Sequence, residues 1–332
     1  MSVWTLLLGG VAVIFAFLLR GHPTTRQTLP SLKENPHPNY MPDFYPNGTD
    51  LHLPMGTMRY WMFGNPKGQR VVLIHGISTG SAVYSNLARF MANSGYHVLV
   101  FDLWGRGFSE APAGYYDEAM YTTQVALLLQ KVGWQKTTVV GLSLGGGIAT
   151  SFSACYREMV ENLVLICPAG LLDKKDLPIA GKLVQLPLVG KIVLDPLVRP
   201  VIIKAVEQFF HSARKTQLDD QQQKIAVAAL HQFTHHPGFL RAFLGTVIDF
   251  PLHSLHERYR TVGHHPELPV LVLWGNQDTT VPFKLHTTLK DLVPQADIRV
   301  YAGGAHDIIL SHGEQINKDI VQFLNQHHAK RQ

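Results

Sequence analysis

Gly141-Leu142-Ser143-Leu144-Gly145 is the most informative part of this chain of 332 residues. It follows the β-branched run Thr137–Val140 and precedes the small-residue run Gly146–Thr150. This order predicts a strand, a sharp turn with a serine at its apex, and a helix. Such a turn exposes the hydroxyl to a histidine that can take its proton and to backbone N–H groups that can bind an oxyanion. The same residues could form a Gly-rich turn whose serine only caps the next helix, so other positions must decide.

On both sides of this turn the chain alternates between short apolar strands and helices. The expected strands, most of them β-branched runs typical of buried parallel strands, cover residues 58–63, 71–74, 97–101, 137–140, 163–166, 270–274 and 297–301. Besides the helix after Ser143, the expected helices have apolar residues on one face and cover residues 81–93, 118–132, 283–292 and 314–325. The alternation predicts an α/β fold with a mostly parallel central sheet flanked by helices.

The alternation breaks between Leu171 and about His265, where no clear buried strand occurs. Apolar stretches with helical character and interrupting prolines occupy this region, at residues 179–189, 192–206, 225–233 and 239–247. We expect a helical cap inserted over the sheet, with its apolar surface packed on the core; part of that surface could instead face an acyl pocket or a membrane. The expected parts are a membrane anchor helix (1–21), a tether (22–54), the first part of the core (55–170), the cap (171–265) and the second part of the core (266–332).

The N-terminus predicts a membrane anchor. Val3 to Leu19 is uncharged and almost wholly apolar, and as a helix it would be roughly 25 Å long, against a hydrocarbon core of about 30 Å. No basic residue precedes it and no clear A-x-A site follows, which favours a single-pass anchor over a cleaved signal peptide. Arg20, Arg26 and Lys33 follow the span and predict a catalytic part that faces the cytosol, whereas the glycosylation sequon Asn47–Thr49 points to the lumen.

Composition narrows the classes of partner. The chain is 46% hydrophobic and 16% charged, as in a globular protein, and its net charge of +5 comes from scattered bases, so nucleic-acid binding is not expected. Cys155 and Cys167 make no disulfide framework and are expected to be small buried residues. The 18 histidines lack a matching acid or cysteine pattern, so no metal and no cofactor is expected. The oligomeric state stays open.

Polar residues follow the expected strands at their carboxyl ends, where open parallel sheets bind ligands. Ser143, Asp278 and His306 each follow a strand, in the order that a catalytic triad of this kind requires. We expect Ser143 to attack a carbonyl carbon, His306 to carry its proton, and Asp278 to hold the imidazole in the right tautomer.

Other polar residues near these strand ends are alternatives or supports. Asp307 is adjacent in sequence to the histidine and so badly placed to accept its Nδ1–H, and Asp173, after a core strand, is a second alternative acid. His75 is expected to be structural. Asp102 and Arg106 are expected to fix loops, although Arg106 could instead bind a substrate carboxylate.

Five motifs occur in an order known from a large enzyme superfamily. They are His75-Gly76, the DxxGxGxS pattern from Asp102 to Ser109, GxSxG around Ser143, Asp278 followed by Val281-Pro282, and Gly304-Ala305-His306. On these motifs the chain resembles the α/β-hydrolase superfamily from about Gly56 to the C-terminus. Its apolar N-terminus, helical insertion and segment Val164–Gly170 are similar to those of membrane-anchored monoacylglycerol lipase-like esterases.

The resemblance implies a membrane-associated serine esterase or lipase that acts on lipid-like esters through an acyl-enzyme. Backbone N–H groups of Ile77 and Leu144 would form the oxyanion hole. Because Ser143 stands where epoxide hydrolases and haloalkane dehalogenases of this fold need a carboxylate, acyl transfer is the expected reaction. One alternative is a hydrolase of small esters, amides or carbon–carbon bonds with the same triad. Another is a non-catalytic binding protein of this fold, against which the complete Ser143, Asp278 and His306 set argues.

Overall fold

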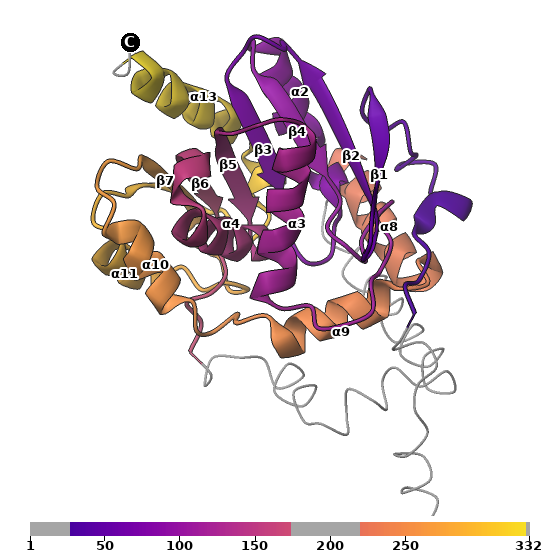
Figure 1. Ribbon diagram of the computed structural model, residues 1–332. Coiled ribbons are helices and arrows are strands. Elements are labelled where there is room, and N and C mark those ends of the chain that lie inside the picture. The colour runs from indigo at the N-terminus through magenta and orange to yellow at the C-terminus, as the bar shows by residue number, and fades with distance from the viewer. Residues whose placement is uncertain (1–26, 174–219, 330–332) are drawn as a thin grey trace, which may run out of the picture.

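The centre of the molecule is one eight-stranded sheet in the order β1-β2-β4-β3-β5-β6-β7-β8. The computed structural model describes residues 27–173 and 220–329 (Figure 1). The strands are β1 (Gly48–Leu53), β2 (Gly56–Gly64), β3 (Arg70–Ile74), β4 (His97–Phe101), β5 (Thr137–Leu142), β6 (Val160–Ile166), β7 (Val270–Gly275) and β8 (Asp297–Tyr301). The six strands β3 to β8 pair in parallel with one another. Strands β1 and β2 add an antiparallel end next to β4. The prediction of a mostly parallel sheet flanked by helices is confirmed.

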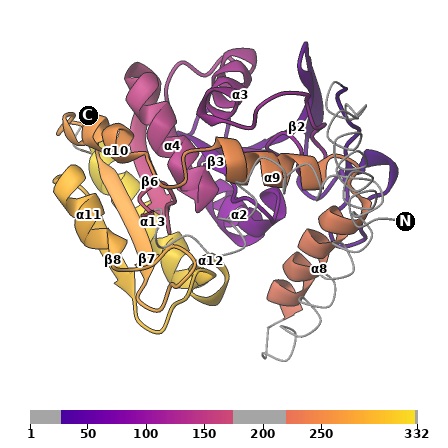
Figure 2. The same ribbon diagram turned by 90° about the horizontal axis from the view of Figure 1, so that it is seen from below.

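Helices cover both faces of the sheet. On one face α2 (Ser85–Asn93) contacts α13 (Gly313–Ala329), and on the other α4 (Leu144–Cys155) contacts both α3 (Glu118–Lys131) and α10 (His256–Gly263) (Figure 2). The remaining helices are α8 (Asp220–His235), α9 (Phe239–Asp249), α11 (Leu285–Leu292), α12 (Ile308–Ser311) and the 3-10 turns η2 (Leu32–Glu34), η3 (Ser81–Tyr84) and η4 (Arg157–Met159). The sheet is therefore buried on both faces, which explains why its central strands are apolar without alternation.

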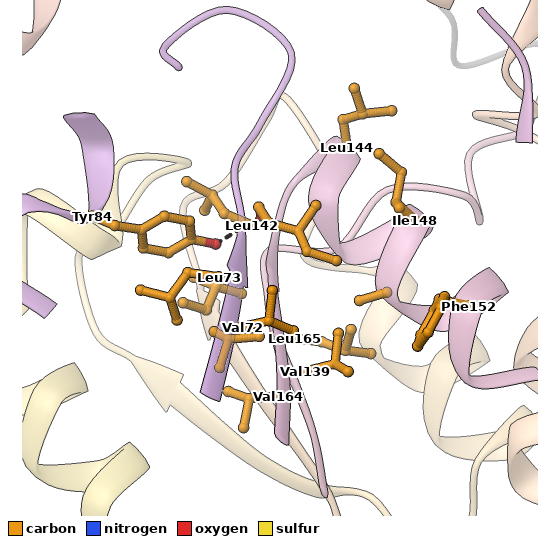
Figure 3. Packing of buried hydrophobic residues seen from close by; sticks show 14 of the residues in the cluster. Val72, Leu73, Tyr84, Val139, Leu142, Leu144, Ile148, Phe152, Val164 and Leu165 are labelled. Carbon is orange, nitrogen blue, oxygen red and sulfur yellow. Dashed lines mark hydrogen bonds between the residues drawn. The ribbon is translucent and has the colours of Figure 1, made fainter. Parts of the chain in front are cut away.

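The hydrophobic core occupies both faces of the sheet, and one part of it lies between the central strands and α4. Side chains from β3, β5 and β6 are fully buried, and Ile148 and Phe152 of α4 lie beside them (Figure 3). Each fully buried aliphatic side chain of this kind contributes about 1.5–3 kcal/mol of transfer free energy. This packing fixes α4, and with it the turn at its start, against the carboxyl ends of the strands.

Close approach of α4 to β3 requires a glycine. A Cβ atom added to Gly145 would lie 2.0 Å from the Ile74 carbonyl oxygen, a separation that backbone atoms cannot tolerate. The first turn of α4 can therefore sit directly on the end of β3. As a result Ser143, which precedes α4, lies beside the segment that follows β3.

The segment before β2 differs from the expected surface tether. Residues 48–53 form the edge strand β1, paired antiparallel with β2, and the side chains of Tyr40 and Tyr45 are buried. Asp50 of β1 forms ion pairs with Lys33 and Arg59, at 2.7 and 2.9 Å. Polar composition predicted a solvated connection, but long-range pairing with β2 and the two tyrosines bind this segment to the core.

The predicted single-pass location in a membrane needs correction. Among the helices of residues 27–173 and 220–329, none combines the length and the apolar character that a membrane span requires. The expected anchor, residues 1–21, lies outside the described residues. We therefore withdraw the single-pass location, together with the cytosolic orientation that depended on it.

Part of the predicted cap is described. Helices α8 and α9 contain the expected stretches 225–233 and 239–247, whereas 179–189 and 192–206 lie outside the described residues. Helix α10 also falls within the predicted cap, yet it contacts α4 and α11. Apart from the tether, the division of the chain into anchor, cap and two core parts stays a prediction.

Candidate active site

Ser143 lies at the junction of β5 and α4 in a conformation that L-residues rarely adopt. Its φ of 54° is positive, as it is at only two other non-glycine residues in the described ranges. Its N–H donates to the Ile166 carbonyl at 2.9 Å, and its carbonyl accepts from the N–H groups of Gly146 and Ala169 at 2.9 and 3.0 Å. Such a conformation costs roughly 1–3 kcal/mol and persists where its surroundings enforce it. Here the strand before, the helix after and the neighbouring strand β6 together enforce it.

His306 connects Ser143 to Asp278. Its Nδ1 is 2.7 Å from Asp278 Oδ2, and its Nε2 is 2.9 Å from Ser143 Oγ. An ionised carboxylate can only accept, so the network assigns the ring proton to Nδ1 and leaves Nε2 to accept the serine O–H. The Asp278 side chain is fully buried, while 24% of the His306 side chain is exposed. The structure thus brings the three predicted residues together in a linear relay.

Asp278 is held as an anion. Its Oδ1 accepts the N–H groups of Thr280 and Val281, both at 2.9 Å, so the turn after β7 binds the carboxylate with its own backbone. Burial by itself would raise the pKa of Asp278. Hydrogen bonds from His306, Val281 and the thiol of Cys167, together with the charge that His306 carries when it is protonated, outweigh burial and hold this pKa below its ordinary value. The carboxylate is therefore ionised at neutral pH.

The segment after β3 presents a backbone N–H group near the serine. The Leu103 N–H donates to His75 Nε2 at 2.9 Å, so His75 carries its proton on Nδ1 and donates it to the Gly76 carbonyl at 2.7 Å. That carbonyl and the Ile77 N–H belong to one peptide plane, so the ring fixes the direction of the N–H. Within the described residues, neither the Ile77 N–H nor the Leu144 N–H donates a hydrogen bond.

A cavity of about 280 Å³ opens at these groups. Ser143, His306 and residues 76–79 line one part of it. Apolar side chains line much of the rest, among them Val83, Leu142, Ile309 and Leu310. The residues that carry a serine hydroxyl, an imidazole and the Ile77 N–H thus line one largely apolar cavity.

Comparison with known proteins agrees with this architecture. The model of a family described as alpha/beta hydrolase fold matches residues 69–313. The chain belongs to the α/β-hydrolase fold family. The resemblance predicted from five sequence motifs is confirmed.

Relatives of this fold have varied names. The chain is 22% identical to a monoacylglycerol lipase, abhd6-B, of Xenopus laevis over 77% of this chain and 75% of that protein. It is 27% identical to a 2-hydroxy-6-oxononadienedioate/2-hydroxy-6-oxononatrienedioate hydrolase of Burkholderia vietnamiensis over 77% and 87% of the two chains. The solved structure of an esterase from Exiguobacterium antarcticum aligns with a TM-score of 0.68 at 20% identity, over 84% of this chain and 99% of that one. At that identity the solved structure supports the fold alone.

One cluster in the described residues has the donor set of a metal site. Ligand atoms of Cys167, Asp278 and His306 lie within 4.8 Å of one another. The carboxylate of Asp278 and the Nδ1 of His306 are already hydrogen-bonded to each other at 2.7 Å. A proton shared between these two atoms occupies the position that a metal ion would need. We therefore assign this cluster to the relay and not to a metal.

The two alternative acids lie elsewhere. Asp307 precedes α12, and its carboxylate is 3.5 Å from the Ser311 hydroxyl. Asp173 is exposed at the end of a described segment. Asp278 is the carboxylate that contacts the imidazole.

Arg106 and Asp102 are loop-fixing residues. Arg106 is fully buried and donates to the carbonyls of Ile77 and Trp104 at 3.2 and 3.0 Å, so it is closed off from a substrate carboxylate. Asp102 accepts the Tyr40 hydroxyl at 2.7 Å. Sequence reasoning missed Tyr40, because no local pattern links it to a loop 62 residues away.

Neutral His75 should make stability depend on pH. Burial, the largest cause, lowers the pKa of His75 from 6.5 to about 3. Between about pH 6.5 and pH 3 the unfolded chain binds a proton here that the folded chain does not. The contribution of neutral His75 to the free energy of unfolding is therefore complete above pH 6.5. It decreases by about 1.4 kcal/mol per pH unit as the pH falls through this window.

The measurement is the free energy of urea unfolding between pH 7 and pH 4, for wild type and for His75→Gln, which cannot titrate. We expect the variant to be less stable at pH 7 and the difference to shrink as the pH falls. Parallel pH profiles for the two proteins would contradict the assignment of a neutral, buried His75.

Proposed function

We propose that the protein is a serine hydrolase that cleaves carboxylic esters, with lipid-like esters such as monoacylglycerols as substrates. The observation that carries the proposal is the pair of hydrogen bonds from Ser143 to His306 at 2.9 Å and from His306 to Asp278 at 2.7 Å. A hydroxyl bonded to an imidazole that a buried carboxylate orients is the arrangement that activates a serine.

The reaction has two halves. In the first, Ser143 Oγ bonds to the ester carbonyl carbon, its proton moves to His306 Nε2, and the alkoxy group leaves as an alcohol with that proton. In the second, water gives a proton to His306 Nε2 and its hydroxyl to the acyl carbon. The bond between the acyl carbon and Ser143 Oγ then breaks, His306 returns the proton to Oγ, and the acid is released. The N–H groups of Ile77 and Leu144 stabilise the oxyanion in both halves, and one such donor is worth about 3 kcal/mol.

The cavity supports a neutral, apolar acyl group. Its described lining contains no lysine or arginine and includes the carboxylate of Asp307. A relative is named for hydrolysis of a dioate, and a substrate of that kind would have to place a carboxylate in its site. An unpaired carboxylate is costly to bury, which favours ester cleavage over carbon–carbon cleavage of a dioate here. The relative named monoacylglycerol lipase supports the lipid-like ester.

Labelling with a fluorophosphonate probe tests the nucleophile. We expect the wild type to be labelled, Ser143→Ala to be unlabelled, and His306→Ala to react at least about a thousandfold more slowly. Ser311→Ala removes an exposed hydroxyl and is the matched control, with wild-type labelling expected. Lack of reaction in the folded wild type would exclude the proposed function.

Substitution of Asp278 by asparagine tests the acid. An amide at this position favours the wrong imidazole tautomer, so kcat on p-nitrophenyl butyrate should fall by about four orders of magnitude with the fold retained. Asp307→Asn and Asp173→Asn serve as controls and should stay within about threefold of wild type. A large loss in either control, with Asp278→Asn active, would transfer the role to that residue.

A series of p-nitrophenyl esters tests the substrate class. Each methylene buried in the apolar cavity is worth about 0.8 kcal/mol, so kcat/KM should rise about fourfold per methylene from acetate until the cavity is filled. The mono-p-nitrophenyl ester of glutaric acid is the charged counterpart of the pentanoate ester and should react far more slowly. A sharp preference for acetate or for the charged ester would contradict the lipid-like substrate.

A further inference from the structure

Three successive carbonyl groups beside the serine are each held by a fully buried side chain. The Gly76 carbonyl accepts from His75 at 2.7 Å, and the Ile77 carbonyl accepts from Arg106 Nε at 3.2 Å. The Ser78 carbonyl accepts from Gln232 Nε2 at 3.1 Å. The φ and ψ bonds of Ile77 therefore lie between two peptides that are both held, and the next peptide is held as well.

Gln232 belongs to α8 and lies 154 residues after Ser78 in the chain. Its Oε1 accepts the Gly107 N–H at 2.7 Å, so one amide joins the loop after β3 to the loop after β4. The partners assign the amide orientation, because an N–H can only donate and a carbonyl can only accept. Helix α8 is thus connected to the backbone beside the oxyanion donor.

Helix α9 reaches the same backbone through Arg106. Arg106 Nη2 donates to Thr246 Oγ1 at 2.8 Å, and the Thr246 hydroxyl donates to the Ala242 carbonyl of its own helix at 2.7 Å. Arg106 also donates to the Tyr121 hydroxyl of α3. Figures 1 and 2 show α8 and α9 as neighbouring orange helices outside the sheet.

We propose that Gln232 and Thr246 are positioning residues of the oxyanion hole, through which α8 and α9 hold the Ile77 N–H in its direction. The inference rests on the proposed function. If α8 moves away, the Ser78 carbonyl loses its buried partner. If α9 moves away, Arg106 loses a hydrogen bond that holds its guanidinium against the Ile77 carbonyl. In either case the neighbouring peptides can turn, and the Ile77 N–H turns with them. Docking of both helices is then a condition for stabilising the transition state.

The test uses variants that keep volume and remove the polar contact, Gln232→Met and Thr246→Val. Loss of an oxyanion donor lowers kcat about 10²–10³-fold, and displacement of one should cost less, about tenfold. We expect kcat on p-nitrophenyl butyrate to fall about tenfold, with KM within twofold of wild type. The inhibition constant of an alkyl trifluoromethyl ketone, whose serine adduct carries an oxyanion, should rise by the factor by which kcat/KM falls.

Two controls separate positioning from general stability. Thr246→Ser keeps the hydroxyl and should restore wild-type values. Thr234→Val makes the same change on α8, at a hydroxyl that donates to carbonyls of its own helix, and should leave kcat unchanged. Rates are divided by the active-site concentration from fluorophosphonate titration, so unfolded protein does not count as slow enzyme.

The outcomes are distinct. Values of kcat and of the inhibition constant within twofold of wild type in both variants, or a change in KM alone, would overturn the inference and leave the proposed function standing. A wild type that neither reacts with the probe nor turns over the ester would remove the proposed function, and the inference with it.

Discussion

The contact between the first turn of α4 and the carboxyl end of β3 is the constraint on which the site depends. Gly145 packs against the Ile74 carbonyl where no side chain fits, and this contact fixes the turn that carries Ser143. The same approach leaves the Ile77 N–H and the serine on one side of the sheet edge. Because β5 is buried between β3 and β6, this arrangement cannot relax without disrupting the core.

Two buried titratable groups around this contact have different charges at neutral pH. His75 has neutral partners on both ring nitrogens, so burial keeps it uncharged and it serves as a fixed hydrogen-bond bridge. Asp278 is also buried, but two backbone N–H groups and the imidazole compensate its charge. At neutral pH Asp278 is thus an anion and His75 an uncharged ring. The difference comes from the partners, because burial alone disfavours charge in both.

Local patterns in the sequence predicted most of the strands of the sheet. They also predicted that the relay residues lie together at the carboxyl ends of these strands. Strand ends with polar residues, such as Asp278 after β7, are visible in sequence because apolar runs stop there. Strand β1 was missed, since its short, half-polar sequence becomes a strand only by pairing with β2. Gln232 and Thr246 were also missed. Each occupies one buried position in an amphipathic helix, and its partner is more than a hundred residues away. Contacts of that range leave no periodicity or spacing in a single sequence.

In the described residues β8 is the last strand of the sheet, and this has a consequence for contacts between molecules. β8 is a short strand whose Asp297 and Arg299 form an ion pair at 3.2 Å, and Arg299 also reaches Asp319 at 3.0 Å. A strand from a second molecule that added to this edge would have to cover these charges and compete with their pairing. Charged edges of this kind discourage intermolecular β-pairing. The edge should therefore resist growth into aggregates while its backbone N–H and carbonyl groups stay hydrated.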